Sequence, residues 1–344
     1  MRLVFFGSGA FGLPTLESLA RSHEIVCVVT QPDKPAGRGG RLSPTPIGGW
    51  TTQHLPAAPL LKPAKVNDPA VTSEIRAFAA DAWVVIAFGQ KLSRTLLDGV
   101  FAVNLHASLL PRWRGAAPIN AAILAGDKQT GNSVITLADR MDAGLVLART
   151  TPPIEIDPLW TAGELHDRLA KDGPDLMARV LADFAAERLA PQAQDESEVT
   201  IATKLSRSDD ALDFRQRADS LRRQIHALTP WPGVTALLLP PPSPGLQPSQ
   251  SAPPPPAPQT VKILRVQTVS ADAESRTGSG QISGAAVPGA LVDPKAGIVA
   301  CGHGTLVRVL EVQPPGKRPM PWADFARGRP ILPMTQLISA KEAL

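Results

Sequence analysis

The segment RLVFFGSGAFG, residues 2–12, decides the fold of the first half of the chain. The apolar run at residues 2–6 predicts a buried strand, and the glycines that follow it, Gly7, Gly9 and Gly12, predict a tight turn. A helix is then expected to run as far as Leu19. A strand, a glycine-rich turn and a helix in this order are typical of nucleotide-type α/β folds.

Apolar runs continue to alternate with helical patterns beyond this first unit. Because strands that alternate with helices favour parallel pairing, the pattern predicts an α/β fold with a mostly parallel, Rossmann-like sheet covered on both faces. The further strands are expected at 24–30, 83–88, 101–105, 133–137 and 144–148, and the helices at 69–80, 116–126 and 161–188.

The pattern changes after residue 189. Residues 190–206 open with a polar run and predict a linker between a first domain at 1–189 and a second domain at 207–344. The second domain is expected to be a small β-barrel, because its apolar runs are short and separated by turn residues. Its helix is expected at 215–228 and its strands at 234–239, 261–269, 298–301 and 305–312. An uncharged, proline-rich insertion at 240–258 predicts an extended surface loop or a disordered segment.

The composition indicates a two-domain protein of the cytoplasm. A length of 344 residues suggests two domains of roughly 100–200 residues each. No stretch approaches the roughly 20 consecutive apolar residues of a membrane-spanning helix, so no membrane association is expected. The two cysteines, Cys27 and Cys301, form neither a metal-spaced pair nor a disulfide framework, which fits a reducing compartment.

Basic charge is concentrated in the second part of the chain. Residues 205–344 carry 15 Lys and Arg against 10 Asp and Glu, whereas residues 1–204 carry 20 against 21. A basic excess confined to one domain suits a polyanionic partner such as a nucleic acid. A solvated basic surface without a partner explains the charge equally well.

The glycine-rich turn also matches the GxGxxG pattern of dinucleotide-binding proteins, with Asp33 about twenty residues beyond it. In that motif the acid ends the second strand and reaches the ribose. Here residues 30–32 intervene, and Asp33 lies between two prolines. An NAD-dependent oxidoreductase is therefore the weaker interpretation, and a turn that serves only the fold is the stronger one.

The segment NLHASLLPRWRGAAPI, residues 104–119, carries the candidate chemistry. Asn104 and His106 end an apolar strand two residues apart, so both side chains share one face at the edge where such sheets bind ligands. An Asn can donate to a developing oxyanion, and a His can move a proton near neutral pH. Asp142 follows a strand in a tight loop and could orient the His. Without further context, the same residues could be structural hydrogen-bonding groups and a turn.

The wider pattern supplies that context. NxHASLLPRWRGAAPI, followed by MDAG at 141–144, closely resembles the folate-dependent formyltransferases, most closely those that act on charged initiator tRNA. The resemblance covers nearly the whole chain except about 240–259. It extends to TQPDKPAGRG at 30–39, AFGQ at 87–90, TPWPG at 229–233, ACGHG at 300–304 and LEVQPPGK at 310–317.

The resemblance implies that Asn104, His106 and Asp142 are catalytic and that the barrel is OB-like and helps to hold tRNA. It implies 10-formyltetrahydrofolate as the formyl donor, methionine on initiator tRNA as the acceptor, and no metal. Leu145 departs from the family pattern, because an acidic residue is common there. The residues implied to contact folate are Phe88, Gly89, Gln90, Lys91, Leu92, Ser108, Leu109, Leu110, Pro111, Ala138 and Asp139.

A basic loop at 32–46 is the expected tRNA contact, through Lys34, Arg38 and Arg41. Its three glycines and four prolines argue against a regular helix or a central strand. Because it follows the second parallel strand, it is expected to leave the sheet at the same edge as the catalytic residues. A monomer is expected.

Two other functions stay open. The protein could formylate a small amine, such as a purine precursor or a sugar nucleotide, although the C-terminal domain and the basic loop argue against this. It could also be a non-catalytic RNA-binding protein, although the intact trio of candidate catalytic residues argues against that. The group that takes the proton of the amine is not decided by the sequence.

Overall fold

The computed structural model describes residues 1–36, 40–241, 258–269, 286–329 and 331–341. Contacts divide the chain into two compact units. The N-terminal unit comprises residues 1–122, 128–156 and 164–203, and the C-terminal unit comprises 123–127, 157–163 and 204–344. Most of the proline-rich insertion, 242–257, and Arg38 of the basic loop lie outside the described residues.

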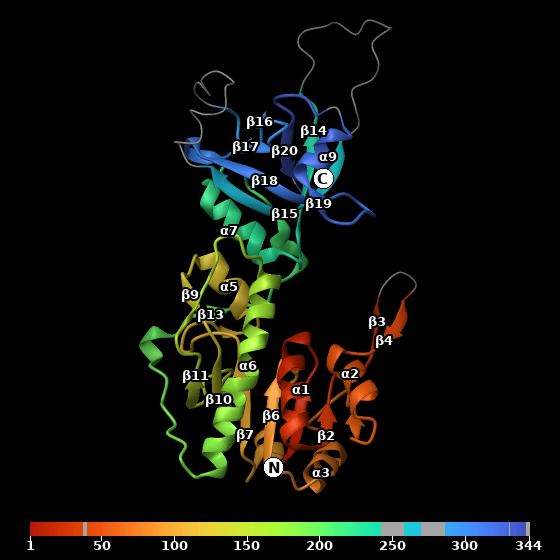
Figure 1. The fold of residues 1–344 in the computed structure, drawn as a ribbon, viewed down its shortest axis with the longest axis vertical. Helices are drawn as coiled ribbons and strands as arrows, with labels where there is room; N and C mark the ends of the chain where they lie inside the picture. Colours follow the sequence, from red (N-terminus) through yellow and green to blue (C-terminus); the bar gives the residue numbers. More distant parts are fainter. Residues whose placement is uncertain (37–39, 242–257, 270–285, 330, 342–344) are drawn as a thin grey trace, which may run out of the picture. The chain divides into compact units, whose positions relative to one another are not determined.

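A seven-stranded sheet forms the centre of the N-terminal unit, in the order β11-β10-β7-β6-β1-β2-β5 (Figure 1). The five strands from β7 to β5 pair in parallel, and β10 and β11 add an antiparallel edge. This confirms the predicted mostly parallel, Rossmann-like sheet. The strands are β1 (Arg2–Gly7), β2 (Glu24–Val29), β5 (Leu60–Leu61), β6 (Ala82–Ile86), β7 (Ala102–His106), β10 (Ser133–Thr136) and β11 (Val146–Arg149).

Burial on both faces explains why the central strands are continuous apolar runs. Every residue of β6 is buried, as are five of the six residues of β1. In α6, Gly173 lies so close to the sheet that a Cβ there would come within 2.7 Å of the Leu105 side chain in β7. The helices are α1 (Leu13–Ser22), α2 (Pro46–His54), α3 (Pro69–Ala77), α4 (Arg94–Leu97), α5 (Pro118–Ala125) and α6 (Ala162–Ala185).

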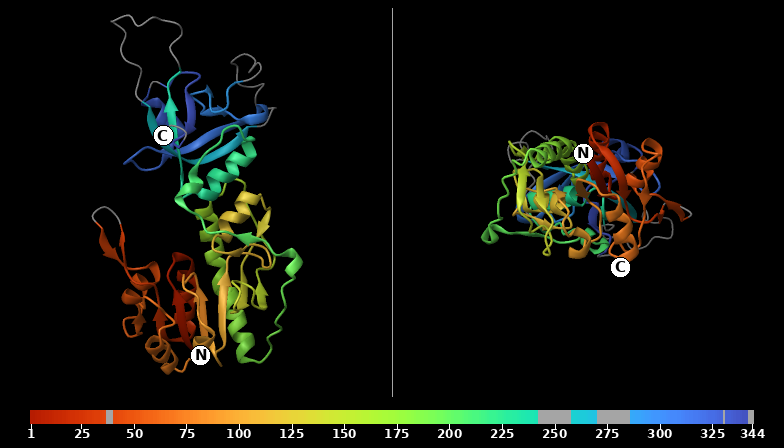
Figure 2. Two further views of the ribbon diagram at one scale, coloured as in Figure 1. Left: turned by 180° about the vertical axis from the view of Figure 1, so that it is seen from behind. Right: turned by 90° about the horizontal axis from the view of Figure 1, so that it is seen from below.

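Three small ribbons accompany the main sheet. β3 (Lys34–Ala36) and β4 (Arg41–Ser43) form an antiparallel hairpin that extends from the rest of the N-terminal unit (Figures 1 and 2). β9 (Gln129–Thr130) pairs with β12 (Ile154–Glu155), and β8 (Arg114–Gly115) pairs in parallel with β13 (Ile201–Ala202). The hairpin occupies part of the basic loop at 32–46. The loop therefore contains two short strands, which pair with each other and not with the central sheet.

The C-terminal unit is built on an antiparallel sheet in the order β16-β17-β18-β15-β14-β20. Its ends approach each other through a bridge between Ala290 and Gln336, so the sheet is a nearly closed barrel, as predicted. The strands are β14 (Val234–Leu239), β15 (Gln259–Val269), β16 (Leu291–Asp293), β17 (Ile298–Ala300), β18 (Leu306–Gln313), β19 (Met320–Pro321) and β20 (Gln336–Ser339). The helix α7 (Ala218–Leu228) and the short helix α9 (Trp322–Arg327) contribute buried side chains to the same core.

No helix among the described residues has the length and apolar character needed to cross a membrane.

Candidate active site

Strand β7 brings the first two candidate catalytic residues to the carboxyl edge of the sheet. Asn104 is half-buried, and His106, the last residue of the strand, is buried. The amide of Asn104 makes no hydrogen bond to any residue that the structure describes. The strand therefore fixes the backbone of Asn104, and its amide is available to donate to a ligand.

Asp142 approaches His106 from the loop between β10 and β11. Its Oδ2 lies 3.5 Å from Nδ1 of His106 and accepts a hydrogen bond of 2.8 Å from the backbone N–H of Gly115. Asp142 has a φ of +53°, in the left-handed region that most residues avoid. The following Gly144 cannot be replaced without a clash, because a Cβ there would lie 1.7 Å from the carbonyl oxygen of Thr136. The loop is thus built tightly enough to fix a carboxylate beside the imidazole.

Both ring nitrogens of His106 face an acceptor. Nε2 lies 2.9 Å from the carbonyl oxygen of Trp113, so Nε2 carries a hydrogen and donates it, while Nδ1 faces Asp142. The side chains of His106 and Asp142 are only 7% and 13% exposed. The hydrogen bond at Nε2 and the carboxylate 3.5 Å from Nδ1 together restrict the orientation of the ring, and a defined orientation is what proton transfer to a defined position requires. The three residues predicted to be catalytic are therefore gathered at one place.

The segment that was predicted to be a linker packs against this place. The backbone N–H groups of Trp113 and Arg114 donate to Oγ1 and to the carbonyl oxygen of Thr200. The Arg114 side chain is almost fully buried and pairs with Glu196 at 2.8 Å. Hydrogen bonds from Arg114 and Arg140 lower the pKa of the Glu196 carboxyl below its ordinary value. Nothing in the polar composition of residues 190–198 indicated these contacts.

The structure divides the first group of predicted folate residues by exposure. Phe88 and Leu92 belong to the apolar core under the sheet, and Phe88 packs edge-on against Phe6 at 5.5 Å. Gly89 and Lys91 are exposed, and Gln90 is half-buried. Only the backbone and the polar members of this segment can therefore face a ligand.

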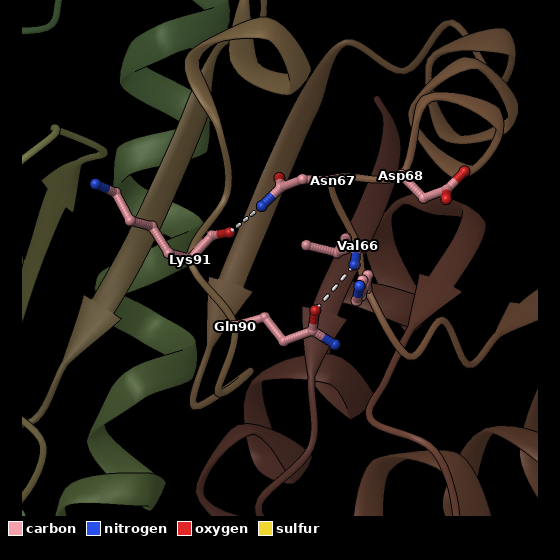
Figure 3. A pocket seen from close by; sticks show the side chains of 6 residues that line it. Val66, Asn67, Asp68, Gln90 and Lys91 are labelled. Atoms are coloured by element: carbon pink, nitrogen blue, oxygen red, sulfur yellow. Dashed lines mark hydrogen bonds between the residues drawn. The ribbon is translucent and has the colours of Figure 1, made fainter.

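Gln90 and Lys91 line a surface pocket together with residues 65–68 (Figure 3). Oε1 of Gln90 accepts from the backbone N–H of Val66 at 2.9 Å, and Asn67 donates to the carbonyl of Lys91 at 2.8 Å. These bonds, drawn as dashed lines in Figure 3, join the segment after β6 to the segment after β5. The Gln90 amide therefore makes its hydrogen bonds within the protein.

The other predicted folate residues lie just after β7 and in the loop between β10 and β11, the two parts of the chain that carry His106 and Asp142. Ser108, Leu110 and Pro111 are buried and Leu109 is half-buried, so this turn offers mostly backbone and apolar surface. Ala138 and Asp139 are exposed, and Asp139 pairs with Arg94, which follows the segment of Phe88 to Leu92. This ion pair joins the two backbone segments predicted to hold the pterin.

The glycine-rich turn after β1 is closed to a dinucleotide. The backbone N–H groups of Ser8 and Gly9 donate to the carbonyl of Ala87, and Oγ of Ser8 donates to the carbonyl of Phe88. Asp33, the acid that would bind a ribose, accepts two hydrogen bonds from Nζ of Lys62 at 2.7 and 2.9 Å. The groups that would hold a pyrophosphate and a ribose are thus occupied, which argues against nicotinamide binding.

Two of the three predicted tRNA contacts lie on the hairpin. Lys34 in β3 and Arg41 in β4 are exposed, and Arg38 lies outside the described residues. Within the described part of the chain there is no group of three or more His, Cys, Asp or Glu side chains arranged to hold a metal ion.

Comparison with known proteins agrees with this geometry. Residues 1–181 match the formyl transferase family, and residues 204–330 match the formyl transferase C-terminal domain. The methionyl-tRNA formyltransferase of Methylobacillus flagellatus is 39% identical over 341 residues, which cover 97% of this chain and 98% of the relative.

Two solved structures show the same fold at low sequence identity. WlaRD, a sugar 3N-formyl transferase, superimposes with a TM-score of 0.60 at 12% identity, over 92% of this chain and 99% of its own. HypX from Aquifex aeolicus superimposes with a TM-score of 0.58 at 14% identity, over 94% of this chain and 46% of its own. From the full-length sequence match and the two matching domains, the chain belongs to the methionyl-tRNA formyltransferase family.

Proposed function

We propose that this protein transfers the formyl group of 10-formyltetrahydrofolate to the amino group of methionine on charged initiator tRNA, giving N-formylmethionyl-tRNA. The observation that carries the proposal is the grouping of Asn104, His106 and Asp142 at the carboxyl edge of β7. The structures of HypX and WlaRD were determined with tetrahydrofolic acid and with 5-N-formyl-THF, which supports a folate as the donor.

The reaction forms one bond and breaks another at the formyl carbon. The amino nitrogen of the methionyl group attacks this carbon, and the resulting tetrahedral adduct carries a negative oxygen. The bond to N10 of the folate then breaks, and one proton moves from the amine to the leaving nitrogen. Asn104 stabilises the oxygen, because its amide is uncommitted and fixed by the strand; removal of one such donor typically lowers the rate roughly 10²–10³-fold.

His106 moves the proton in this proposal. Its ring is oriented by Asp142 at Nδ1, while the hydrogen on Nε2 is held by the carbonyl of Trp113 until substrate arrives. His106 exchanges this hydrogen bond for one to the adduct oxygen or to the leaving nitrogen. Because the side chain is only 7% exposed, the proton is shielded from bulk water during the transfer.

The folate is held between the segments 88–92 and 138–139, with 108–111 as an apolar wall. The Arg94–Asp139 ion pair supports this arrangement, although both side chains are substantially exposed and the pair adds little to stability. The tRNA is held by the basic C-terminal unit and by Lys34, Arg38 and Arg41 of the basic loop at 32–46. The monomeric state and the cytoplasmic location remain predictions.

One experiment tests the proposal. The purified protein is incubated with 10-formyltetrahydrofolate and with charged initiator tRNA, charged elongator tRNA, free methionine or an amino-sugar nucleotide, and formylated product is quantified. We expect formylmethionine on initiator tRNA and little product from the small amines. Formylation of a small amine in preference to the charged tRNA would overturn the proposed acceptor. A His106→Ala enzyme with normal turnover would overturn the proposed chemistry.

A further inference from the structure

We propose that Gln194, from the segment between the two matched domains, is a positioning residue for catalysis, because it holds the Asp142 loop in its active shape. The inference rests on the proposed function, since it assigns Gln194 a role through Asp142. It assigns a function to residues 192–202, a segment whose sequence predicts only a linker.

The Gln194 side chain binds the loop at two points. Its Nε2 donates to the carbonyl of Asp142 at 2.7 Å and to the carbonyl of Gly144 at 2.8 Å. Asp142 is at a φ of +53°, and a non-glycine residue in this region of backbone conformation is strained unless its surroundings hold it. A donor that bridges the carbonyls on both sides of Ala143 is well placed to supply that support.

Gln194 is itself fixed from behind by Arg114. Oε1 of Gln194 accepts from Nε of Arg114 at 2.9 Å, and the guanidinium of Arg114 also donates to Glu196 at 2.8 Å. Because the Arg114 side chain is only 3% exposed, its position is set by packing and by these bonds. The fixed orientation of the amide follows directly: Arg114 donates to the oxygen, so the nitrogen must face the loop.

The backbone on both sides of Gln194 is anchored as well. Gln192 pairs with Val146 through two backbone hydrogen bonds of 2.8 and 2.9 Å, and β13 pairs with β8 further along. The same β8 residue, Gly115, donates its N–H to Oδ2 of Asp142. Residues 192–202 therefore brace Asp142 through its main chain, and β8 braces it through its carboxylate.

The decisive variant is Gln194→Glu. A glutamate keeps the length of the side chain and its acceptor for Arg114, but an ionised carboxylate has no hydrogen to donate to the two carbonyls. We expect kcat to fall roughly 10²-fold with KM for both substrates nearly unchanged, because a misplaced catalytic group costs about this much. The matched control is Gln192→Glu in the same segment, because Gln192 anchors the segment through its main chain, which the substitution keeps. Its exposed side chain makes, among the described residues, a single 3.4 Å contact to Arg149, so kcat should stay within twofold of the wild-type value.

A double-mutant cycle separates positioning from general support of the fold. The Gln194→Met change is made in the wild-type and in the Asp142→Ala enzyme, and single-turnover rates are compared. If Gln194 acts through Asp142, Gln194→Met slows the wild-type enzyme strongly but slows the Asp142→Ala enzyme less than twofold. Equal fold-losses in both backgrounds, or a Gln194→Glu enzyme with wild-type kcat, would overturn the inference.

These experiments distinguish a failure of the role proposed for Gln194 from a failure of the proposed function. If the wild-type protein does not formylate methionyl-tRNA, or if Asp142→Ala leaves kcat intact, the proposed function or catalytic assignment fails. If both behave as proposed and Gln194→Glu remains fully active, only the role of Gln194 fails. Should Gln194→Glu fold poorly, the cycle with Gln194→Met decides the matter.

Discussion

The stability of the protein should depend on pH through His226, which is fully buried in α7 of the C-terminal unit. Its Nδ1 lies 3.2 Å from the carbonyl oxygen of Pro158, and its Nε2 accepts from the backbone N–H of Val266 at 3.1 Å. This pairing requires a neutral ring with its hydrogen on Nδ1. Burial, with the positive charges of Arg222 and Arg265 nearby, lowers the pKa of His226 from 6.5 to about 4.

The sign of the effect follows from this lowered pKa. The unfolded chain binds a proton at His226 below pH 6.5, whereas the folded chain binds it only near pH 4. Stability is therefore fully present above pH 6.5 and is lost as the pH falls towards 4. The full difference is about 3 kcal/mol, and about 2 kcal/mol of it should already be lost at pH 5.

Urea unfolding of the full chain at several values between pH 5 and pH 7 measures this dependence. We expect the His226→Asn protein to be less stable at pH 7 but to lose about 2 kcal/mol less than the wild type between pH 7 and pH 5. The control is His303→Asn, because His303 is exposed in the same unit and its φ of +58° suits Asn. Equal pH dependence of the wild-type and His226→Asn proteins would refute the reasoning, as would a folded-state titration of His226 near 6.5.

Three further predictions concern the site, the hairpin and the core. Asp142→Asn should lower kcat roughly 10²–10⁴-fold without changing KM for folate, and unaltered single-turnover rates would remove Asp142 from the mechanism. Arg41→Ala should flatten the slope of log tRNA affinity against log salt by about 0.7–0.9 if Arg41 contacts one phosphate, whereas the exposed Arg21→Ala should leave the slope unchanged. Cys27 and Cys301 are buried, and burial raises the pKa of each thiol to about 12. A thiol reagent should therefore label neither cysteine until urea unfolds the chain. Rapid labelling of the native protein at neutral pH would contradict this prediction.

The architecture could be predicted from sequence where burial imposes a pattern. A strand buried on both faces is typically a continuous apolar run, so β1, β2, β6 and β7 were predicted to within two residues of their bounds. The hairpin of β3 and β4 was not predicted from the sequence, because it is solvent-exposed and carries no periodic apolar face. Strand positions are fixed by the core, whereas a two-stranded ribbon is fixed by local turn geometry.

The grouping of the three candidate catalytic residues was predictable in part. Asn104 and His106 lie two residues apart in one strand, so their side chains share a face, and this spacing can be read from the sequence. Their meeting with Asp142 depends on the loop between β10 and β11. This loop leaves β10 at Thr136, opposite Val103 at the start of β7, and still brings Oδ2 of Asp142 to 3.5 Å from Nδ1 of His106. The contacts of Gln194 depend on residues 192–198, a mostly polar and exposed stretch that has no periodic apolar face for a sequence pattern to detect.

The glycine-rich turn shows how one local structure can serve different functions. A GxGxxG turn after a strand offers backbone N–H groups, and in a dinucleotide-binding protein these face a pyrophosphate. Here the N–H groups of Ser8 and Gly9 are taken by Ala87, from the segment that follows β6, and the Ser8 hydroxyl is taken by Phe88. The turn therefore helps to fix the beginning of the segment proposed to hold the folate. Close packing accounts for two of its glycines, since a Cβ at Gly7 would lie 2.6 Å from the Phe5 ring and one at Gly12 would lie 3.3 Å from the Ile86 side chain.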